Sequence, residues 1–304
     1  MIKAHRFVFI LFLQLFVIAS LRCSAKDLPA FDGENAYKYL LKQCDFGPRN
    51  PGSQGYVKCR DYLIRTLGLF ADQVSTQSFM LSFEPPPTTV SATNIIARFQ
   101  PEKEERILLC AHWDTRPWAD QDPDPKNHNK PILGANDGAS GVAVLLQIAT
   151  ILHKQKPPVG VDIVLFDGED VGHSGSERSY ARGSAAFASE LGGSFRPKFG
   201  ILLDMIGDAD LKIYQEAYSA QYAPSVVKKV WDKAALLAID EFVPQVMYAV
   251  FDDHIPLLEV GIPCIDLIDF DYPYWHTLED TPDKCSAESL EKIGRLLVAL
   301  IYEQ

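Results

Sequence analysis

Two acidic side chains follow directly after a short apolar segment near the middle of the chain. Residues 161–166 (Val-Asp-Ile-Val-Leu-Phe) predict a strand that is buried on both faces. The next residues, 167–170, read Asp-Gly-Glu-Asp. Ligands of open α/β sheets bind beyond the carboxyl ends of the strands, so Glu169 and Asp170 can divide proton transfer and metal binding between them. An isolated Glu-Asp pair is more often part of a solvated turn. The interpretation therefore depends on whether other predicted strands also end in ionisable residues.

Three further apolar segments lead into ionisable residues in the same way. They are 107–111 before His112, 199–203 before Asp204, and 261–268 on the approach to His276. The segment 107–111 is followed by a His-x-Asp triplet, in which a carboxylate can orient an imidazole as it does around bound metals. Four predicted buried strands therefore deliver ionisable groups to one edge of a sheet.

A turn of small residues adds a fifth ionisable position to this edge. Residues 134–141 (Gly-Ala-Asn-Asp-Gly-Ala-Ser-Gly) precede an apolar segment with helical character, and Asp137 stands at the start of that helix. The turn has neither the G-x-G-x-x-G pattern nor the lysine of a phosphate-binding loop. We interpret it as a closely packed turn that presents a carboxylate ligand.

So many ionisable groups on one rim need a physical explanation, because unpaired buried charge is unfavourable. A shared cation provides one. Aspartate and imidazole ligands without paired thiolates suit zinc in an open, catalytic site better than in a closed structural site. The residue pattern favours such a site over a purely structural acidic cluster.

Length, composition and charge limit the classes of protein to consider. The chain has 304 residues, of which 47% are hydrophobic, and no internal repeat, which predicts one large α/β domain over residues 26–304. The formal net charge is −11, and without a basic run we expect no nucleic-acid partner. The predicted helices cover 34–44, 53–67, 142–152, 224–238 and 286–302, and residues 177–190 are expected to contain another. Two further strands cover 74–83 and 93–99, and a short strand is expected at 211–214.

The N-terminus has the pattern of a secretory signal peptide. Lys3 and Arg6 precede the apolar residues 7–21, and small residues follow at 23–25. We therefore assign 1–25 to a signal peptide and expect export to the periplasm or the extracellular space, with no stable membrane domain. Retention of this segment as an anchor stays open. Five cysteines remain after residue 25, and the compartment permits a bridge between Cys44 and Cys59.

Several other polar and aromatic residues have simpler interpretations. The loop 116–133 is polar and rich in proline. It could wall a pocket, but we interpret it as a solvated loop and give its acidic residues no metal role. We expect three tryptophans to be packing or loop residues and three histidines to be solvated, whereas His254 either lies beside the site or anchors its loop. These residues are Asp120, Asp122 and Asp124; Trp113, Trp118 and Trp231; and His128, His153 and His173.

The motifs carry a resemblance to a known family. In order they are His-x-Asp at 112–114, Asn-Asp-Gly-Ala-Ser-Gly at 136–141, Asp-Gly-Glu-Asp at 167–170, Leu-Leu-Asp-Met-Ile-Gly-Asp at 202–208, Asp-Asp-His at 252–254 and Trp-His-Thr at 275–277. This series resembles the M28 zinc peptidase clan and, within it, the glutaminyl cyclases, from about Ala36 onward. The resemblance implies a three-layer α/β sandwich around a mixed, mostly parallel, twisted sheet, as in zinc aminopeptidases.

The resemblance allows two activities. In a two-zinc aminopeptidase, which hydrolyses N-terminal residues, Glu169 would activate water. The zinc ligands would be Asp137 as a bridge, Asp170 and His276 at one metal, and His112 and Asp204 at the other. In a glutaminyl cyclase, N-terminal glutamine of peptides or proteins becomes pyroglutamate and ammonia is released.

The cyclase reading assigns a role to each residue by resemblance. Asp137, Asp170 and His276 would hold one zinc ion, with Asp170 in place of the Glu of the animal enzymes. Glu169 would shuttle a proton from the α-amine to the departing amide. Asp204 and Asp252 would support that transfer through hydrogen bonds, and Trp275 would line the substrate pocket.

Particular residues decide between the readings. Asp252 stands where aminopeptidases tend to have Ser, and Trp275 directly precedes His276, which favours the cyclase. Two departures affect the substrate pocket: residues 171–176 lack the second tryptophan of the family, and Phe251 replaces the Gln of the animal cyclases. A non-catalytic binding module is a third hypothesis, against which the presence of Glu169 and a complete ligand set argue.

Overall fold

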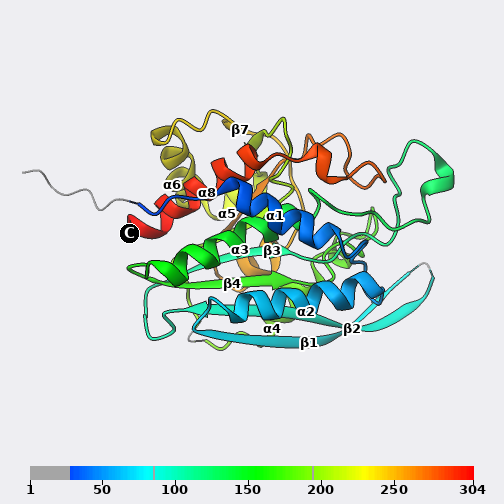
Figure 1. Cartoon of the computed structure of the whole chain (residues 1–304), viewed down its shortest axis with the longest axis horizontal. Helices are drawn as coiled ribbons and strands as arrows, with labels where there is room; N and C mark the ends of the chain where they lie inside the picture. Colours follow the sequence, from blue (N-terminus) through cyan, green and yellow to red (C-terminus); the bar gives the residue numbers. More distant parts are fainter. Residues whose placement is uncertain (1–27, 85, 194) are drawn as a thin grey trace, which may run out of the picture.

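The apolar segments form neighbouring strands of one six-stranded sheet with the order β1-β2-β4-β3-β5-β8 (Figure 1). The strands β4, β3, β5 and β8 run parallel, whereas β1 and β2 form an antiparallel hairpin that joins the sheet through β2 and β4. The mixed, mostly parallel sheet is therefore confirmed. The strands are β1 (Gln73–Phe83), β2 (Thr88–Phe99), β3 (Arg106–His112), β4 (Gly160–Phe166), β5 (Gly200–Asp204) and β8 (Cys264–Ile268).

The structure is a computed structural model that describes residues 28–84, 86–193 and 195–304. The predicted signal peptide at 1–25 lies outside the described residues. Among the residues described, no helix is long and apolar enough to cross a membrane. The five cysteines in this part of the chain are buried and free, so the permitted bridge between Cys44 and Cys59 is not formed.

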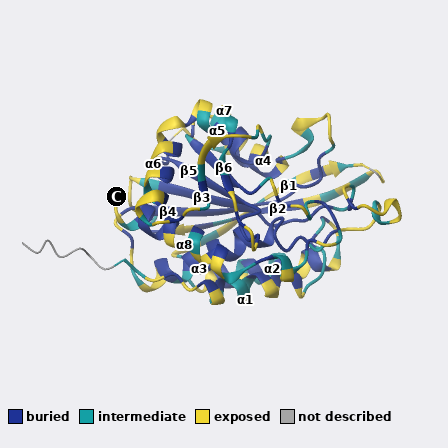
Figure 2. Ribbon diagram, turned by 90° about the horizontal axis from the view of Figure 1, so that it is seen from above, coloured by how far each residue is buried: buried dark blue, intermediate teal, exposed yellow. Residues whose placement is uncertain are grey.

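Helices cover both faces of the sheet and complete three layers. Figure 2 shows α1, α2, α3 and α8 on one face and α4, α5 and α7 on the other, and α6 packs on α8. The helices are α1 (Gly33–Cys44), α2 (Gln54–Gly68), α3 (Ala139–Lys154), α4 (Arg182–Glu190), α5 (Ala217–Tyr222), α6 (Pro224–Leu236), α7 (His254–Glu259) and α8 (Ala287–Tyr302).

The burial pattern follows from these layers. Every residue of β4, β5 and β8 is buried, as expected for strands that are covered by helices on both faces. The helix α3 is buried along most of its length because it lies between the sheet and α1. Ser53 caps α2 as predicted, and its hydroxyl accepts a hydrogen bond from Tyr56 N at 3.0 Å.

Two expected elements are present with shifted bounds, and one strand was not predicted. The helix expected within 177–190 is α4, and a short 3-10 turn (Glu177–Ser179) precedes it because Ala181 adopts a left-handed backbone with φ of 53°. The short strand expected at 211–214 is β6 (Ile213–Gln215), which pairs with the strand that was not predicted, β7 (Phe242–Val246). The latter strand is mostly exposed and contains proline, so it lacks the apolar signal of a buried strand.

The turn of small residues packs closely, as predicted. A Cβ on Gly141 would lie 2.4 Å from Leu203 O and 3.0 Å from Ala111 Cβ. Because Leu203 O is a backbone atom of β5, it cannot move aside without moving the strand. Gly141 therefore allows α3 to approach the sheet directly below the edge that carries the ionisable residues.

We predict that Gly141→Ala lowers the free energy of unfolding by about 1–3 kcal/mol, because the added methyl group overpacks a rigid contact. The matched control is Gly68→Ala near the end of α2, where an added Cβ meets nothing within 4 Å. That change should be neutral or stabilise the protein by up to about 1 kcal/mol. Urea unfolding of both variants tests the comparison, and equal stabilities would contradict it.

Candidate metal and active site

Ionisable side chains from separate parts of the chain meet beyond the carboxyl edge of the central sheet. The strands β3, β4, β5 and β8 are parallel, so their carboxyl ends share this edge. The contributions are His112 at the end of β3, Glu169 and Asp170 after β4, Asp204 at the end of β5, His276 after β8 and Asp137 ahead of α3.

The first group that could hold a cation consists of Asp137, Asp170 and His276. His276 Nε2 lies 3.6 Å from Asp137 Oδ2 and 3.2 Å from Asp170 Oδ1, and one ligand atom from each residue lies within 4.8 Å of the others. All three side chains are buried, and one oxygen of each carboxylate has no hydrogen-bond partner in the described chain. A bound cation would relieve this unfavourable burial, so the donor set fits zinc with an open position.

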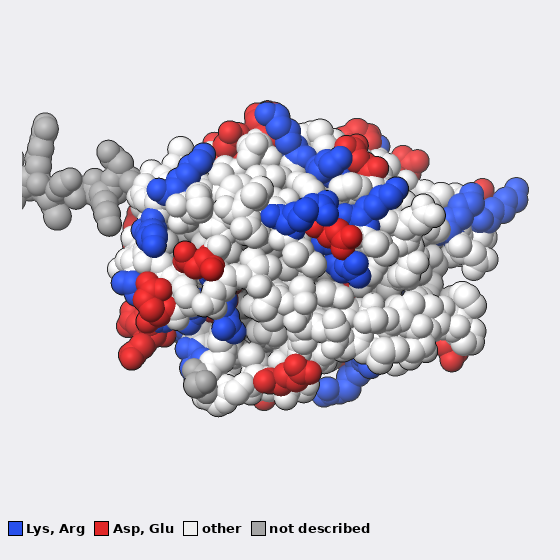
Figure 3. All heavy atoms as spheres, turned by 60° about the horizontal axis from the view of Figure 1, so that its bottom comes forward, with Lys and Arg blue, Asp and Glu red and all other residues white. Residues whose placement is uncertain are grey.

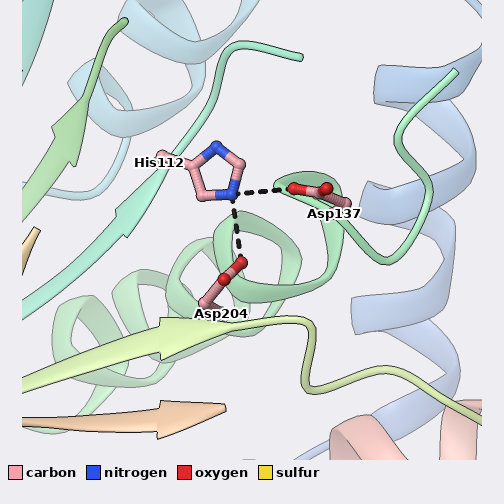
Figure 4. A group of neighbouring side chains, drawn as sticks. All are labelled: His112, Asp137 and Asp204. Atoms are coloured by element: carbon pink, nitrogen blue, oxygen red, sulfur yellow. Dashed lines mark hydrogen bonds and ion pairs between the residues drawn. The ribbon is translucent and has the colours of Figure 1, made fainter. Parts of the chain in front are cut away.

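The second group consists of His112, Asp137 and Asp204, and it shares Asp137 with the first. Figure 4 shows the His112 ring between the two carboxylates, with Nε2 at 3.2 Å from Asp137 Oδ1 and 3.0 Å from Asp204 Oδ1. Burial alone would lower the pKa of His112, but hydrogen bonds with the surrounding aspartates raise it well above its ordinary value. A protonated His112 can therefore offset part of the negative charge of this group without a second metal.

Arg116 and Asp120 orient the proposed ligands, although the sequence gave these loop residues no such role. Asp120 Oδ1 lies 3.3 Å from His276 Nδ1, and Arg116 donates to both oxygens of Asp120 at 2.7 and 2.6 Å. Arg116 Nη1 also lies 3.3 Å from Asp170 Oδ1. The predicted solvated loop is therefore wrong at this point, because Arg116 is buried and Asp120 is half-buried.

The last residue of the His-x-Asp triplet, Asp114, holds the acidic turn after β4. The Asp114 carboxylate accepts hydrogen bonds from Glu169 N at 3.2 Å and Asp170 N at 3.3 Å, and it lies 3.7 Å from His112 Nδ1. Asp114 is fully buried. The triplet thus positions both carboxylates that the sequence associates with chemistry.

Asp280 holds the turn that carries Asp137, and the sequence did not identify it. Its carboxylate accepts hydrogen bonds from Asn136 N at 2.8 Å, Asp137 N at 3.1 Å and the Tyr272 hydroxyl at 2.8 Å. Burial, followed by the charge of Asp137, raises the pKa of Asp280 to about 7. A cation on Asp137 would lower this pKa because it offsets the repulsion between the two acids.

Glu169, Asp204 and Asp252 line one pocket of about 320 Å³. Burial raises the pKa of Glu169 well above its ordinary value, and the neighbouring Asp252 raises it further. Burial also raises the pKa of Asp204 and, more strongly, that of Asp252. Because each ionised carboxylate disfavours ionisation of the next, the three titrate as a set, and Glu169 is placed to accept and return protons.

Aromatic side chains form the rest of the pocket. Trp275 stacks on His276 with ring centroids 3.8 Å apart, and Phe251 lines the pocket from the segment before Asp252. His173 lines it from the segment 171–176, which lacks the second tryptophan, and Tyr180 lines it from just beyond that segment. The prediction that His173 is solvated is therefore wrong, since it is half-buried and borders the pocket.

The other histidine and tryptophan expectations can also be compared with the structure. His254 is buried, and its Nε2 lies 3.2 Å from Glu216 Oε2. Glu216 also accepts a hydrogen bond from Val250 N at 3.1 Å, so His254 anchors the loop that carries Asp252. Trp113 and Trp231 are buried packing residues, as predicted.

Comparison with known proteins places this geometry in a family. The sequence profile of peptidase family M28 matches residues 94–301. The glutaminyl-peptide cyclotransferase of Bos taurus is 24% identical over 289 residues, which cover 84% of this chain and 78% of that protein.

The sequence identity to proteins of solved structure is higher. The chain is 38% identical to a Bacteroides thetaiotaomicron glutaminyl cyclase, solved with N-acetylhistamine, with a TM-score of 0.87 over 91% of this chain and 100% of that one. A leucine aminopeptidase precursor from the same organism has the same identity and TM-score, with 91% and 99% coverage.

We predict that Asp280→Asn weakens zinc binding about 10- to 100-fold, because a neutral amide holds the turn at Asp137 less firmly. Competition with a chromophoric zinc chelator measures the affinity. The matched control is Asp283→Asn, which changes an exposed carboxylate three residues later in the chain. Equal affinities for the parent and Asp280→Asn would remove Asp280 from the metal site.

Proposed function

The chain belongs to peptidase family M28, and we propose that it is a glutaminyl cyclase that converts N-terminal glutamine of peptides or proteins to pyroglutamate and ammonia. The names of its relatives support this activity. The observation that carries the proposal is the placement of Glu169, with its raised pKa, in one pocket with Asp204 and Asp252 and beside the ligand set. This arrangement suits repeated proton transfer next to a polarised carbonyl.

Zinc is the proposed cofactor, with Asp137, Asp170 and His276 as its ligands. When bound, zinc supplies a Lewis acid that polarises the γ-carbonyl of the substrate glutamine. One ion per chain is the proposed stoichiometry. The ion pairing of His112 with Asp137 and Asp204 supports this number, because an imidazolium between those carboxylates already offsets part of the negative charge that a second metal would balance.

The residues of the chain divide the chemical steps. Glu169 takes a proton from the α-amine, whose nitrogen attacks the Cδ carbonyl carbon and closes a five-membered lactam. Glu169 then returns the proton to the amide nitrogen, the bond between Cδ and that nitrogen breaks, and ammonia leaves. Asp204 and Asp252 hold the shared protons that keep Glu169 ready for both transfers. Trp275 lines the pocket around the substrate side chain.

This chemistry needs no water as the nucleophile. The attacking amine is already part of the substrate, so proximity replaces the activation of a separate nucleophile. That distinguishes the proposed reaction from peptide hydrolysis in the same family, for which a two-zinc site and an activated water would be required. The leucine aminopeptidase precursor with the same fold keeps hydrolysis as the alternative activity.

The proposed place of action is outside the cytoplasm. Residues 1–25 have the charged, apolar and small-residue regions of a signal peptide. In this proposal the mature protein, a single catalytic domain over residues 26–304, acts in the periplasm or the extracellular space.

The first test incubates the zinc-loaded mature protein with Gln-Ala and with Leu-Ala and identifies the products by mass spectrometry. The proposal predicts loss of ammonia from Gln-Ala and no reaction of Leu-Ala. Free leucine from Leu-Ala would instead establish the aminopeptidase, with His112 and Asp204 as additional ligands. Inactivity on both dipeptides would support a binding module.

We predict that Glu169→Gln lowers kcat at least about 100-fold, because glutamine cannot accept the amine proton. In the parent protein, Glu169 works only when ionised. Its raised pKa therefore places the acid limb of the profile of kcat/KM against pH well above 4.5, the ordinary pKa of a glutamate, and kcat/KM should rise with pH through that limb. Loss of the limb in Glu169→Asp, or an unchanged kcat in Glu169→Gln, would contradict the assignment.

A further inference from the structure

A second hollow lies next to the candidate active site. Its volume is about 770 Å³, compared with about 320 Å³ for the pocket that Glu169 lines. Two projecting segments form its walls: the tip of the β1–β2 hairpin and the loop 116–133. Figure 1 shows both at the same end of the molecule.

Aromatic rings from three segments line this hollow. Trp118 stacks on His173 with centroids 5.1 Å apart and planes 4° apart, and Phe83 lies 6.2 Å from Trp118. The Arg116 guanidinium lies 5.2 Å from the Trp118 ring on which it packs. Phe83 is half-buried at the end of β1 and therefore still offers apolar surface. Stacked rings of this kind bind flat or apolar side chains well.

The hollow and the active-site pocket are neighbours. His173 lines both of them. Asp120, which lines the hollow, contacts His276 Nδ1 at 3.3 Å. A molecule that extends out of the active-site pocket past His173 therefore reaches the aromatic hollow without crossing another part of the protein surface.

The two projecting segments differ in how many charged side chains they carry. Residues 79–92 of the hairpin contain one charged side chain, Glu84. Figure 3 shows correspondingly broad uncharged surface on the lower of the two projections at the right-hand end, whereas Lys and Arg gather on the upper one. The hairpin side of the hollow thus presents a surface for apolar groups in a protein whose formal net charge is −11.

We propose that this hollow is a subsite for an aromatic or other large apolar side chain in the residues that follow the N-terminal glutamine. The inference rests on the proposed function. The cyclisation uses the amine and the side chain of glutamine inside the inner pocket, so only the chain beyond its α-carbonyl can continue outward. An extended peptide advances about 3.3 Å per residue, and the Trp118 ring lies 5.1 Å from that of His173, so the second and third residues of the substrate are the ones that reach the rings.

The test measures kcat/KM for Gln-Ala, Gln-Ala-Ala, Gln-Phe-Ala and Gln-Ala-Phe with the zinc-loaded protein. The subsite predicts that at least one phenylalanine peptide is preferred over Gln-Ala-Ala by about three- to tenfold, through a lower KM. The variant Phe83→Ala should abolish this preference and leave Gln-Ala turnover unchanged.

Phe79→Ala is the matched control. Phe79 lies on the same strand, is half-buried and packs against the same small apolar cluster as Phe83, but it does not line the hollow. It should keep the preference for phenylalanine. The turnover of Gln-Ala by each variant shows whether that variant is folded.

Two results would overturn the inference in different ways. Turnover of Gln-Ala with equal kcat/KM for all three tripeptides, or equal losses of the preference in both variants, would remove the subsite and leave the proposed function standing. Failure of the parent to cyclise Gln-Ala would remove the proposed function and the subsite with it.

Discussion

The withdrawal of several carboxylates from water at one edge of the central sheet is the constraint on which the rest of the structure depends. Parallel strands bring their carboxyl ends to the same edge, so residues after β4 and β5 must share a small volume. Burial there makes ionised groups unfavourable unless they are paired. The protein compensates in three ways: His112 pairs with two carboxylates, Arg116 pairs with two others, and oxygens without partners remain where a cation fits.

The same constraint connects stability with chemistry. A carboxylate that is buried beside other acids keeps its proton to a higher pH, and this raised pKa suits Glu169 for taking a proton from an amine and giving it back. Asp114 accepts hydrogen bonds from the backbone amides of Glu169 and Asp170. These bonds hold the turn that carries the two neighbouring acids, which have different proposed roles. Water exclusion around them strengthens every charge interaction in the pocket.

Much of the fold and most of the candidate site could be predicted from the sequence, because both depend on local signals. Apolar runs such as 161–166 identify the strands, and the residue type that follows each run identifies the ionisable group. Parallel strands then place those groups at one edge. The predicted ligand trio Asp137, Asp170 and His276 is indeed brought together, although its role as a zinc site stays a prediction.

The residues that orient this site could not be predicted, for a physical reason. Asp280 and Asp120 act through contacts between loops that are far apart in the sequence, and nothing local distinguishes them from solvated acids. His173 lines the pocket and stacks on Trp118, a contact between residues that are far apart in the sequence. Tertiary contacts of this kind leave no period or motif, whereas the strand ends that they support do.

The central claim is that the substrate's own amine, and not water, attacks the carbonyl. The most direct test is to react Gln-Ala with the zinc-loaded protein in ¹⁸O-enriched water and to determine the isotope content of the products by mass spectrometry. The account predicts pyroglutamyl-Ala that contains no solvent oxygen, together with ammonia. Free glutamine that carries ¹⁸O in its carboxylate would show that water is the nucleophile and would contradict the account.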